Sequence, residues 1–183
     1  FRHIDSRRAR VVLLEGGPRV LASFVDAQSA QARAQLERLG VEVRTGSKVT
    51  HIDGAGVRVA GADGAEALLP SRTVIWAAGV AAVPLGRALA EIAGTAPDRA
   101  GRVPVAPDLS LPGHPEISVV GDLAAAHSHR RGAEPRPVPG VSPAAKQMGR
   151  CAAANILRRL RGEPARAFVY ADYGNLATIG RRA

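Results

Sequence analysis

Short apolar runs and glycine-containing turns alternate at the start of the chain. Residues 11–14 form a continuous apolar run that stops at Glu15, which is typical of a strand buried on both faces. Asp26 predicts the N-cap of a helix whose apolar positions recur every three or four residues, and Gly40 predicts its end. Residues 41–43 follow as a second strand. Together they predict a strand-helix-strand crossover unit of a parallel sheet.

Three short segments rich in β-branched or aliphatic residues come next, at residues 49–52, 57–59 and 67–69. The turns at Asp53-Gly54 and Asp63-Gly64 suit hairpin loops, so these segments predict a small antiparallel meander. Residues 73–79 are apolar and predict another buried strand. It ends at Gly79, where the missing side chain permits a ligand or another backbone to approach closely.

The second half of the chain predicts a less regular arrangement. Residues 85–92 indicate a short helix, and residues 102–105 indicate an edge strand because proline cannot donate to a ladder. Residues 117–120 read as a buried strand that ends at Gly121-Asp122. The polar stretch at residues 127–140, rich in proline and arginine, is typical of a surface loop.

A long helix is predicted from Ser142 and Pro143 to about Arg161, because a serine N-cap and a first-turn proline start helices well. Its apolar stripe would consist of Ala145, Met148, Ala152, Ile156 and Leu160. The stripe contains alanines and lacks an aromatic anchor, which favours an ordinary helix with a solvated basic side over a membrane-surface helix. Residues 168–170 and 176–179 indicate the start of a further β element.

Composition limits the function classes. The 183 residues carry 25 Lys and Arg against 16 Asp and Glu, and 46% are apolar. No run approaches the roughly 18 apolar residues that span a bilayer. Only 3% are aromatic, so stacking platforms for nucleic acid are scarce and we expect no nucleic-acid partner. The single cysteine, Cys151, cannot close a disulfide within the chain, which favours a reducing compartment.

Motifs for several chemistries are missing. The sequence has neither the G-x-G-x-x-G dinucleotide fingerprint nor a P-loop, and it lacks G-x-S-x-G and H-E-x-x-H. His127 and His129 lie in an arginine-rich loop and are better explained as solvated residues than as a metal site. Cys151 is better explained as a small buried side chain than as a reactive thiol. We therefore predict no metal and no catalytic side chain.

Two acidic residues stand at the ends of predicted strands. At such a position Glu15 can accept both hydroxyls of an adenosine ribose, which favours NAD over NADP because a 2'-phosphate would be repelled. Alternatively, it is only a polar residue at a strand end. Asp122 lies where ligands bind in α/β folds, or else it caps a helix that starts at Leu123.

Five segments together resemble the type II NADH dehydrogenases, flavoproteins that pass electrons from NADH to a membrane quinone. They are residues 11–15, 39–43, 73–80, 119–122 and 170–180. The resemblance implies an α/β fold: an incomplete two-dinucleotide-binding-domain (Rossmann-like) flavoprotein with a small antiparallel meander. Residues 1–83 would be the C-terminal part of an NADH-binding domain, and residues 84–183 would belong to an FAD-binding domain. On that template the chain is expected to be a fragment, inactive alone, whose two glycine fingerprints lie upstream.

The resemblance also assigns roles to individual residues. Glu15 would bind the NADH ribose, Ala78 and Gly79 would lie along the cofactor path, and Gly121 and Asp122 would hold the ribityl and phosphate region of FAD. The start of the last helix, Pro143-Ala144, would face the flavin, where the helix dipole favours negative charge. The family's quinone-side pattern has two glutamines four residues apart. Only the second is retained here, as Gln147 after Lys146.

The implied cofactors are FAD and NAD, and the implied partners are NADH and quinone. The family resemblance further implies a peripheral protein on the cytoplasmic face of the cell membrane, attached through parts absent from this sequence, and it is compatible with a homodimer. Two other functions remain open at this point. One is a flavoprotein reductase that delivers electrons to a ferredoxin-like protein, and the other is a non-catalytic basic module that binds a membrane surface or nucleic acid.

Overall fold

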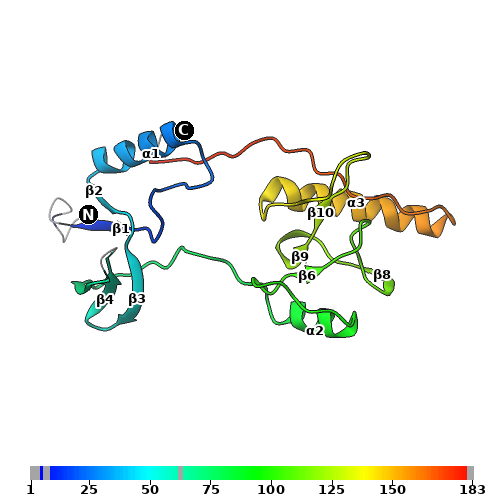
Figure 1. The fold of residues 1–183 in the computed structure, drawn as a ribbon, viewed down its shortest axis with the longest axis horizontal. Coiled ribbons are helices and arrows are strands. Elements are labelled where there is room, and N and C mark those ends of the chain that lie inside the picture. The colour runs from blue at the N-terminus through cyan, green and yellow to red at the C-terminus, as the bar shows by residue number, and fades with distance from the viewer. Residues whose placement is uncertain (1–4, 6–8, 62–63, 181–183) are drawn as a thin grey trace. The chain divides into compact units, whose positions relative to one another are not determined.

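The computed structural model describes residue 5 and residues 9–61 and 64–180. These residues form two compact units (Figure 1). One unit holds the described residues up to Ala77 together with those from Asn175 onward. The other unit is Ala78–Gly174.

The first unit contains the predicted crossover. Strand β1 (Val11–Leu14) pairs in parallel with β2 (Val41–Arg44), and helix α1 (Asp26–Arg38) connects them. Val20, Ala32 and Val43 form the buried centre of this unit. The parallel strand-helix-strand unit is therefore confirmed.

Details at both ends of α1 differ in part from expectation. Gly40 adopts φ +85°, the left-handed conformation expected after a helix. Asp26, however, is not the cap: Val25 holds that position, and Asp26 lies in the first turn, where its carboxylate pairs with Arg19. Strand β1 is not buried on both faces, since Val11 is 55% exposed. The reason is that β1 has only β2 beside it among the described residues.

The predicted meander is confirmed as a three-stranded antiparallel sheet of β3 (Lys48–Asp53), β4 (Gly56–Ala60) and β5 (Glu66–Pro70). Gly56 starts the central strand with φ +142°, and a Cβ atom there would lie 2.3 Å from the carbonyl oxygen of Leu69. Only glycine fits where two backbones approach this closely.

The buried strand predicted at residues 73–79 is absent. These residues form no strand, and the side chains of Ile75 and Trp76 are 85% and 62% exposed. An apolar run becomes a buried strand only when neighbouring strands pair with it, and no other described segment does so. The local pattern indicated the right residue types but could not supply the partner.

The second unit joins two helices through very short strands. Helix α2 (Leu85–Ile92) has the predicted bounds. The strands are β6 (Val103–Pro104), β7 (Ser110–Leu111), β8 (His114–Ser118), β9 (Ala124–Ala125), β10 (His127–Ser128) and β11 (Arg136–Pro137). β6 pairs in parallel with β9, and the other strands form two antiparallel pairs, β7 with β8 and β10 with β11.

Three expectations for this unit need correction. The strand expected at residues 117–120 starts earlier, as β8, and stops at Ser118, although Val119 is buried. The loop at residues 127–140 contains the β10 and β11 pair, and Val138 enters the core. Residues 168–170 form no strand, and neither do residues 176–179, which belong to the first unit. Phe168 is instead buried, and its backbone bonds to Pro107 and His129.

Helix α3 (Ser142–Leu160) has the predicted bounds, but its N-cap is Val141 and not Ser142, which lies in the first turn and makes no capping hydrogen bond. The predicted apolar stripe is also wrong. The buried residues of the helix are Ala144, Met148, Ala152 and Asn155. Of the expected stripe, Ile156 and Leu160 are 48% and 79% exposed. The helix is rotated from the expected orientation because a polar side chain, Asn155, occupies the centre of the buried face.

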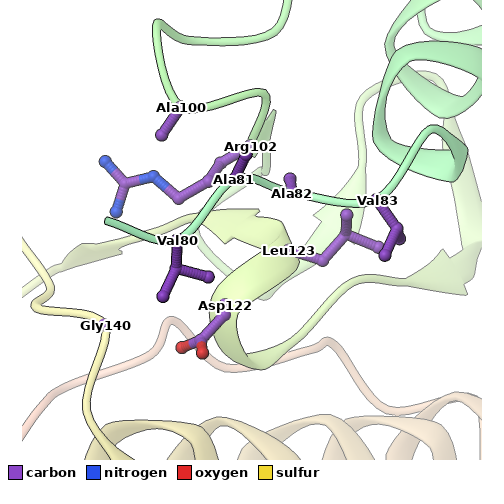
Figure 2. Close-up of a pocket in the computed structure, with 9 residues that line it drawn as sticks. All are labelled: Val80, Ala81, Ala82, Val83, Ala100, Arg102, Asp122, Leu123 and Gly140. Carbon is purple, nitrogen blue, oxygen red and sulfur yellow. The ribbon is translucent and has the colours of Figure 1, made fainter. Parts of the chain in front are cut away.

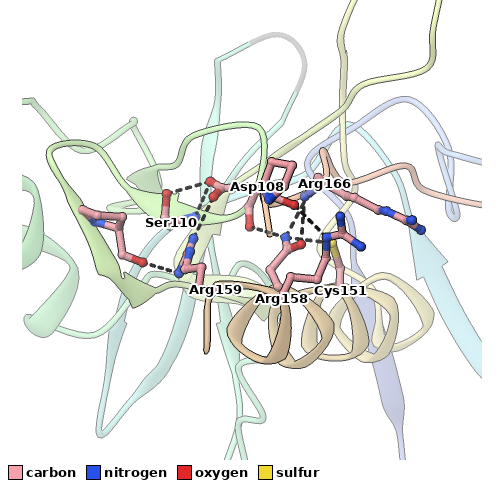
Figure 3. A network of polar contacts seen from close by, with 9 residues as sticks. Asp108, Ser110, Cys151, Arg158, Arg159 and Arg166 are labelled. Carbon is pink, nitrogen blue, oxygen red and sulfur yellow. Dashed lines mark hydrogen bonds and ion pairs between the residues drawn. The ribbon is translucent and has the colours of Figure 1, made fainter. Parts of the chain in front are cut away.

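Asn155 is the centre of a polar network between α3 and the chain around it. Figure 3 shows this network, with Asp108, Arg159 and Arg166 among its labelled residues. Its amide nitrogen donates to the carbonyl oxygens of Asp108 and Arg166, and its amide oxygen accepts the Arg166 N–H at 2.9 Å. Arg159 donates to the Asp108 carboxylate at 2.7 Å. Burial would raise the pKa of Asp108, but hydrogen bonds from Ser110 and Arg159 outweigh it and lower the pKa below its usual value.

None of the helices formed by the described residues is both long and apolar enough to cross a membrane.

Candidate functional site

The turn after Val120 carries Asp122 to the first part of α3. This turn is a short 3₁₀ helix, η2 (Gly121–Leu123), which starts with Gly121 at φ +70°. The Gly121 N–H donates to the sulfur of Met148 at 3.3 Å. A Cβ atom at Gly121 would lie 3.6 Å from that of Ala145. Gly121 thus fixes the acidic turn against α3.

A cavity of about 350 Å³ lies at this turn (Figure 2). Most of its lining is aliphatic or backbone, with one carboxylate and one guanidinium. The lining residues are Val80, Ala81, Ala82, Val83, Ala100, Arg102, Asp122, Leu123 and Gly140. All belong to the second unit, so the cavity does not depend on how the two units are placed.

The two charged side chains of this cavity differ in their bonding. The Arg102 Nε donates to Asp98 at 2.7 Å. Burial would raise the pKa of Asp98, but hydrogen bonds from the backbone and side chain of Arg102 lower it overall, which keeps this ion pair charged. No hydrogen bond or ion pair from the described residues engages the carboxylate of Asp122. Asp122 is therefore the acceptor available to a ligand.

Gly140 makes room beside that acceptor. A Cβ atom at Gly140 would lie 3.5 Å from Oδ1 of Asp122, so a larger side chain would stand against the carboxylate. Sequence reasoning missed Gly140, Arg102 and residues 80–83. The one available signal was Pro139-Gly140, a turn pair placed just before the start of a long helix.

The first turn of α3 offers a ligand fewer free backbone N–H groups than its sequence suggested. The side chain of Ala144 is fully buried, and its N–H donates to the Val141 carbonyl at 3.0 Å. The Ala145 N–H donates to the same oxygen at 3.1 Å. Pro143 is exposed and has no N–H to donate. Any favourable effect on an anion here therefore comes mainly from the helix dipole.

Gln147 already uses both ends of its side-chain amide. Its nitrogen donates to the Ala171 carbonyl and its oxygen accepts the Ala171 N–H, each at 2.9 Å. This two-point contact fastens the segment after Phe168 to α3. Lys146, next to it, is exposed and has no ion pair among the described residues.

Replacing Gln147 with alanine is expected to destabilise the protein by about 1–3 kcal/mol, because two hydrogen bonds are lost and each is worth about 0.5–1.5 kcal/mol. The stability of the Gln147→Glu protein should lie between those of the unchanged protein and the Gln147→Ala protein, since glutamate keeps an acceptor for the Ala171 N–H but loses the donor. Urea unfolding of the purified protein measures the difference. Lys146→Ala is the matched control, and equal stability of the Gln147→Ala and Lys146→Ala proteins would contradict the prediction.

Glu15 lies in the first unit, directly after β1. Its Oε1 accepts the Gly17 N–H at 2.7 Å, and its backbone bonds to Arg44 and Ser47. The carboxylate is thus held in the turn at the carboxyl end of the parallel pair, where Rossmann units bind the ribose. Ala78 and Gly79 are exposed at the start of the second unit, next to the cavity residue Val80. The structure brings Gly121, Asp122 and the first turns of α3 together, and it leaves Glu15 in a separate unit.

Other reactive chemistry finds little support among the described residues. Burial, followed by the nearby charge of Asp108, raises the pKa of the Cys151 thiol, which works against a reactive thiolate. Among the residues that the structure describes, no group of three or more His, Cys, Asp or Glu could hold a metal ion.

The fold is of the α/β class, with a parallel crossover that ends at an acidic residue and a second unit in which a carboxylate without a partner among the described residues lines an aliphatic cavity. The family model described as "pyridine nucleotide-disulphide oxidoreductase" matches residues 3–149. The chain belongs to this family. The predicted fold class is thereby confirmed as a partial Rossmann-like domain pair with an antiparallel meander.

Curated relatives agree with this assignment. The chain is 44% identical over 184 residues to the type II NADH:quinone oxidoreductase Ndh of Mycobacterium tuberculosis, and 39% identical over 188 residues to NdhA of the same organism. These alignments cover 99% and 100% of the chain but only 38% of each relative. The chain thus spans well under half of the length of the relatives it matches.

Among solved structures, the ferredoxin reductase of the CYP199A2 system from Rhodopseudomonas palustris is similar, with a TM-score of 0.63 and 29% identity. The match covers 89% of this chain and 38% of that one.

Proposed function

We propose that the protein to which this chain belongs is an FAD-dependent NADH:quinone oxidoreductase. The observation that carries the proposal is the Asp122 cavity. The carboxylate of Asp122 has no partner among the described residues, and the turn that bears it is held against α3 by the contact of the Gly121 N–H with Met148. The two mycobacterial relatives, both named type II NADH:quinone oxidoreductases, support the choice of reaction.

The cavity residues fit part of a flavin dinucleotide. A carboxylate is a strong acceptor for the hydroxyl groups of a polyol or ribose, and the aliphatic walls suit the apolar faces of such a cofactor. The volume of about 350 Å³ suits only a portion of FAD, so residues beyond this chain would complete the site. Bound FAD would supply the redox chemistry, accepting hydride from NADH and passing electrons to quinone.

Within this proposal the residues of the chain would bind and orient the cofactors and the quinone. Asp122 would accept hydroxyl hydrogen bonds from FAD, and Gly121 would let the cofactor approach the turn. Pro143 and Ala144 would direct the positive end of the α3 dipole toward it. Ala78 and Gly79 would border the path of the cofactor. Lys146 would lie on the quinone side, and Gln147 would order that side through its contact with Ala171.

The domain assignment forms part of the same proposal. Residues 1–83 would complete an NADH-binding domain and residues 84–183 would belong to an FAD-binding domain. The parallel pair β1 and β2, with Glu15 at its carboxyl end, supports a dinucleotide site in the former.

Substituting Glu15 with glutamine is expected to narrow the preference for NADH over NADPH by about tenfold, because the negative charge that repels a 2'-phosphate is removed. The ratio of kcat/KM for the two nucleotides, measured on the full-length protein, checks this. Glu37→Gln, on the exposed side of α1, is the charge-matched control. An unchanged ratio in the Glu15→Gln protein would count against the assigned ribose contact.

The function itself is tested by purifying the full-length protein and measuring NADH oxidation with a short-chain quinone and, separately, with a ferredoxin. We expect a flavin absorption spectrum and quinone-dependent turnover. Turnover with ferredoxin alone would replace the proposed function by a ferredoxin reductase. A colourless, inactive protein would contradict the proposed function and favour a non-catalytic binding module.

We further propose a peripheral location on the cytoplasmic face of the cell membrane and a homodimeric assembly. The membrane location follows from a lipid-soluble acceptor. Cell fractionation with an alkaline wash, together with light scattering of the purified protein, tests both statements.

A further inference from the structure

The chain turns back on itself at the end of α3. Gly162 follows the helix with φ +72°, the left-handed conformation that lets a chain reverse direction after a helix. The carbonyl oxygens of Arg158 and Arg159 accept hydrogen bonds from the N–H groups of residues 161–163, which closes this turn. Residues 163–167, which form no helix or strand, then return beside the helix.

Asn155 fixes this returning segment, residues 163–167, against α3. Its side chain is 2% exposed and forms two hydrogen bonds of 2.9 Å with the backbone of Arg166. Phe168, directly after the segment, is buried, and its N–H donates to the Pro107 carbonyl at 2.7 Å. The backbone that carries Arg166 is therefore already ordered, which lowers the entropy lost when a ligand binds to it.

A groove of about 380 Å³ lies between the helix and the returning segment. Ala154 and Leu157 supply an aliphatic wall on the helix side. The volume lies in the range of small-molecule sites, and the groove shares no lining residue with the Asp122 cavity. All of its lining residues belong to the second unit. The groove is thus a second candidate site, defined within one unit.

Arginine dominates the charged side chains of this groove. Arg158, Arg161 and Arg166 line it, together with one acidic residue, Glu163. Arg158 pairs with Glu163 at 2.9 Å and donates to the Pro164 carbonyl, so these two opposite charges compensate each other. Among the described residues, no ion pair or hydrogen bond engages the guanidinium groups of Arg161 and Arg166. The groove therefore carries two unpaired positive charges.

The helix dipole explains only part of this arrangement. A cation is favoured at the carboxyl end of a helix, which accounts for Arg161. Arg166 lies outside α3, on a backbone that a buried side chain of the helix holds in place. Figure 3 shows Arg158 on the helix and Arg166 on the returning segment. Like charges that line one groove repel each other, and a bound anion would remove this repulsion.

We propose that this groove binds a small, soluble phosphate monoester. A phosphate monoester carries between about 1.5 and 2 negative charges at neutral pH and offers three acceptor oxygens. Guanidinium groups bind phosphate through paired N–H donors, which Arg161 and Arg166 both have available. The aliphatic wall contacts the carbon part of the ester. A nucleobase fits less well, because the groove has no aromatic side chain on which it could stack.

Phosphorus NMR of glycerol 3-phosphate, added to the full-length protein, tests this binding. The protein is saturated with FAD and NAD⁺, so that glycerol 3-phosphate cannot enter a dinucleotide site. Binding broadens the signal of glycerol 3-phosphate, and a titration gives its affinity. Arg161→Ala and Arg166→Ala are each expected to weaken binding about tenfold, because each removes a hydrogen bond between charged groups. Arg131→Ala removes the same charge from an exposed loop and should leave the affinity unchanged.

Two further variants separate ligand binding from a structural role of the arginines. Glu163→Gln removes the acidic charge of the groove and should strengthen binding about threefold, within the range measured for partly exposed charge pairs. Arg166→Lys keeps the positive charge but loses the paired donors, so its affinity should lie between those of the unchanged protein and the Arg166→Ala protein. Neither result is expected if the arginines only stabilise the fold.

The proposal does not rest on the oxidoreductase function, because the measurement involves no turnover. Absence of broadening at millimolar glycerol 3-phosphate would overturn it. Equal affinities of the unchanged protein and both alanine variants would place the phosphate elsewhere on the protein. Tighter binding of succinate would replace the phosphate ester with a dicarboxylate, and binding only to phosphatidylglycerol vesicles would replace it with a lipid headgroup.

Discussion

Replacing Asn155 with alanine will lower the free energy of unfolding by about 3 kcal/mol or more, the largest stability effect that we expect from one side chain of α3. The side chain is 2% exposed and makes three hydrogen bonds to backbone groups of Asp108 and Arg166. Its removal leaves those groups without partners and releases two segments from the helix. A partly buried polar group left unpaired costs about 1–3 kcal/mol, whereas an exposed one costs little.

Denaturant unfolding of the full-length protein, followed by circular dichroism, measures the change. Ile156→Ala is the matched control: it removes an aliphatic group of similar size from the next position, but that side chain is 48% exposed, so the substitution should cost under about 1 kcal/mol. Asn155→Asp should be at least as harmful as Asn155→Ala, because it places a carboxylate against two carbonyl oxygens. Similar stabilities of Asn155→Ala and Ile156→Ala would refute the role given to this network.

Substituting Asp122 with alanine is expected to weaken flavin binding by about 10- to 100-fold, because hydrogen bonds to a charged group are worth about 1.5–3 kcal/mol. The carboxylate is the unpartnered acceptor in the cavity, since Arg102 is held by Asp98. Asp122→Asn should lose less flavin affinity, because an amide oxygen still accepts a hydrogen bond from a hydroxyl group.

Fluorescence titration of the flavin-free protein with FAD measures this affinity. Glu91→Ala, an exposed acidic residue on α2, controls for the loss of one negative charge. If the Asp122→Ala and Glu91→Ala proteins retain FAD equally, the cavity is not the flavin contact. In that case the thermal stability of the Asp122→Ala protein would still show whether η2 keeps its position against α3.

Local sequence patterns were sufficient to predict those helices and turns whose ends are set by residues nearby in the sequence. The bounds of α2, the start of α3 and the turn between β3 and β4 follow from residues that are close in sequence, such as Pro143 and Gly54. Asp63, in the second predicted turn of the meander, lies outside the described residues. Periodicity and turn chemistry act over a few residues, so they can be read without knowledge of the rest of the chain. The same holds for Glu15, which stands beside a glycine turn immediately after β1.

The candidate functional site could be predicted only in part from local sequence patterns. The acid after an apolar run indicated Asp122, but apart from Leu123 its neighbours in the cavity come from three other places in the chain. Gln147 was expected on the quinone side, and the structure gives its amide a backbone partner 24 residues away. No pattern in the helix itself could have named Ala171 as that partner.

The sequence by itself determined the crossover unit, the meander, the two helices and the acids at strand ends, because each depends on contacts within a short stretch. The tertiary structure decided which side of α3 is buried, that Asn155 replaces Ile156 and Leu160 at the core, and that residues 73–79 form no strand. Those outcomes depend on which distant segments are present to pair with or cover a given face. A burial pattern is a property of two surfaces, and the sequence of one of them does not specify the other.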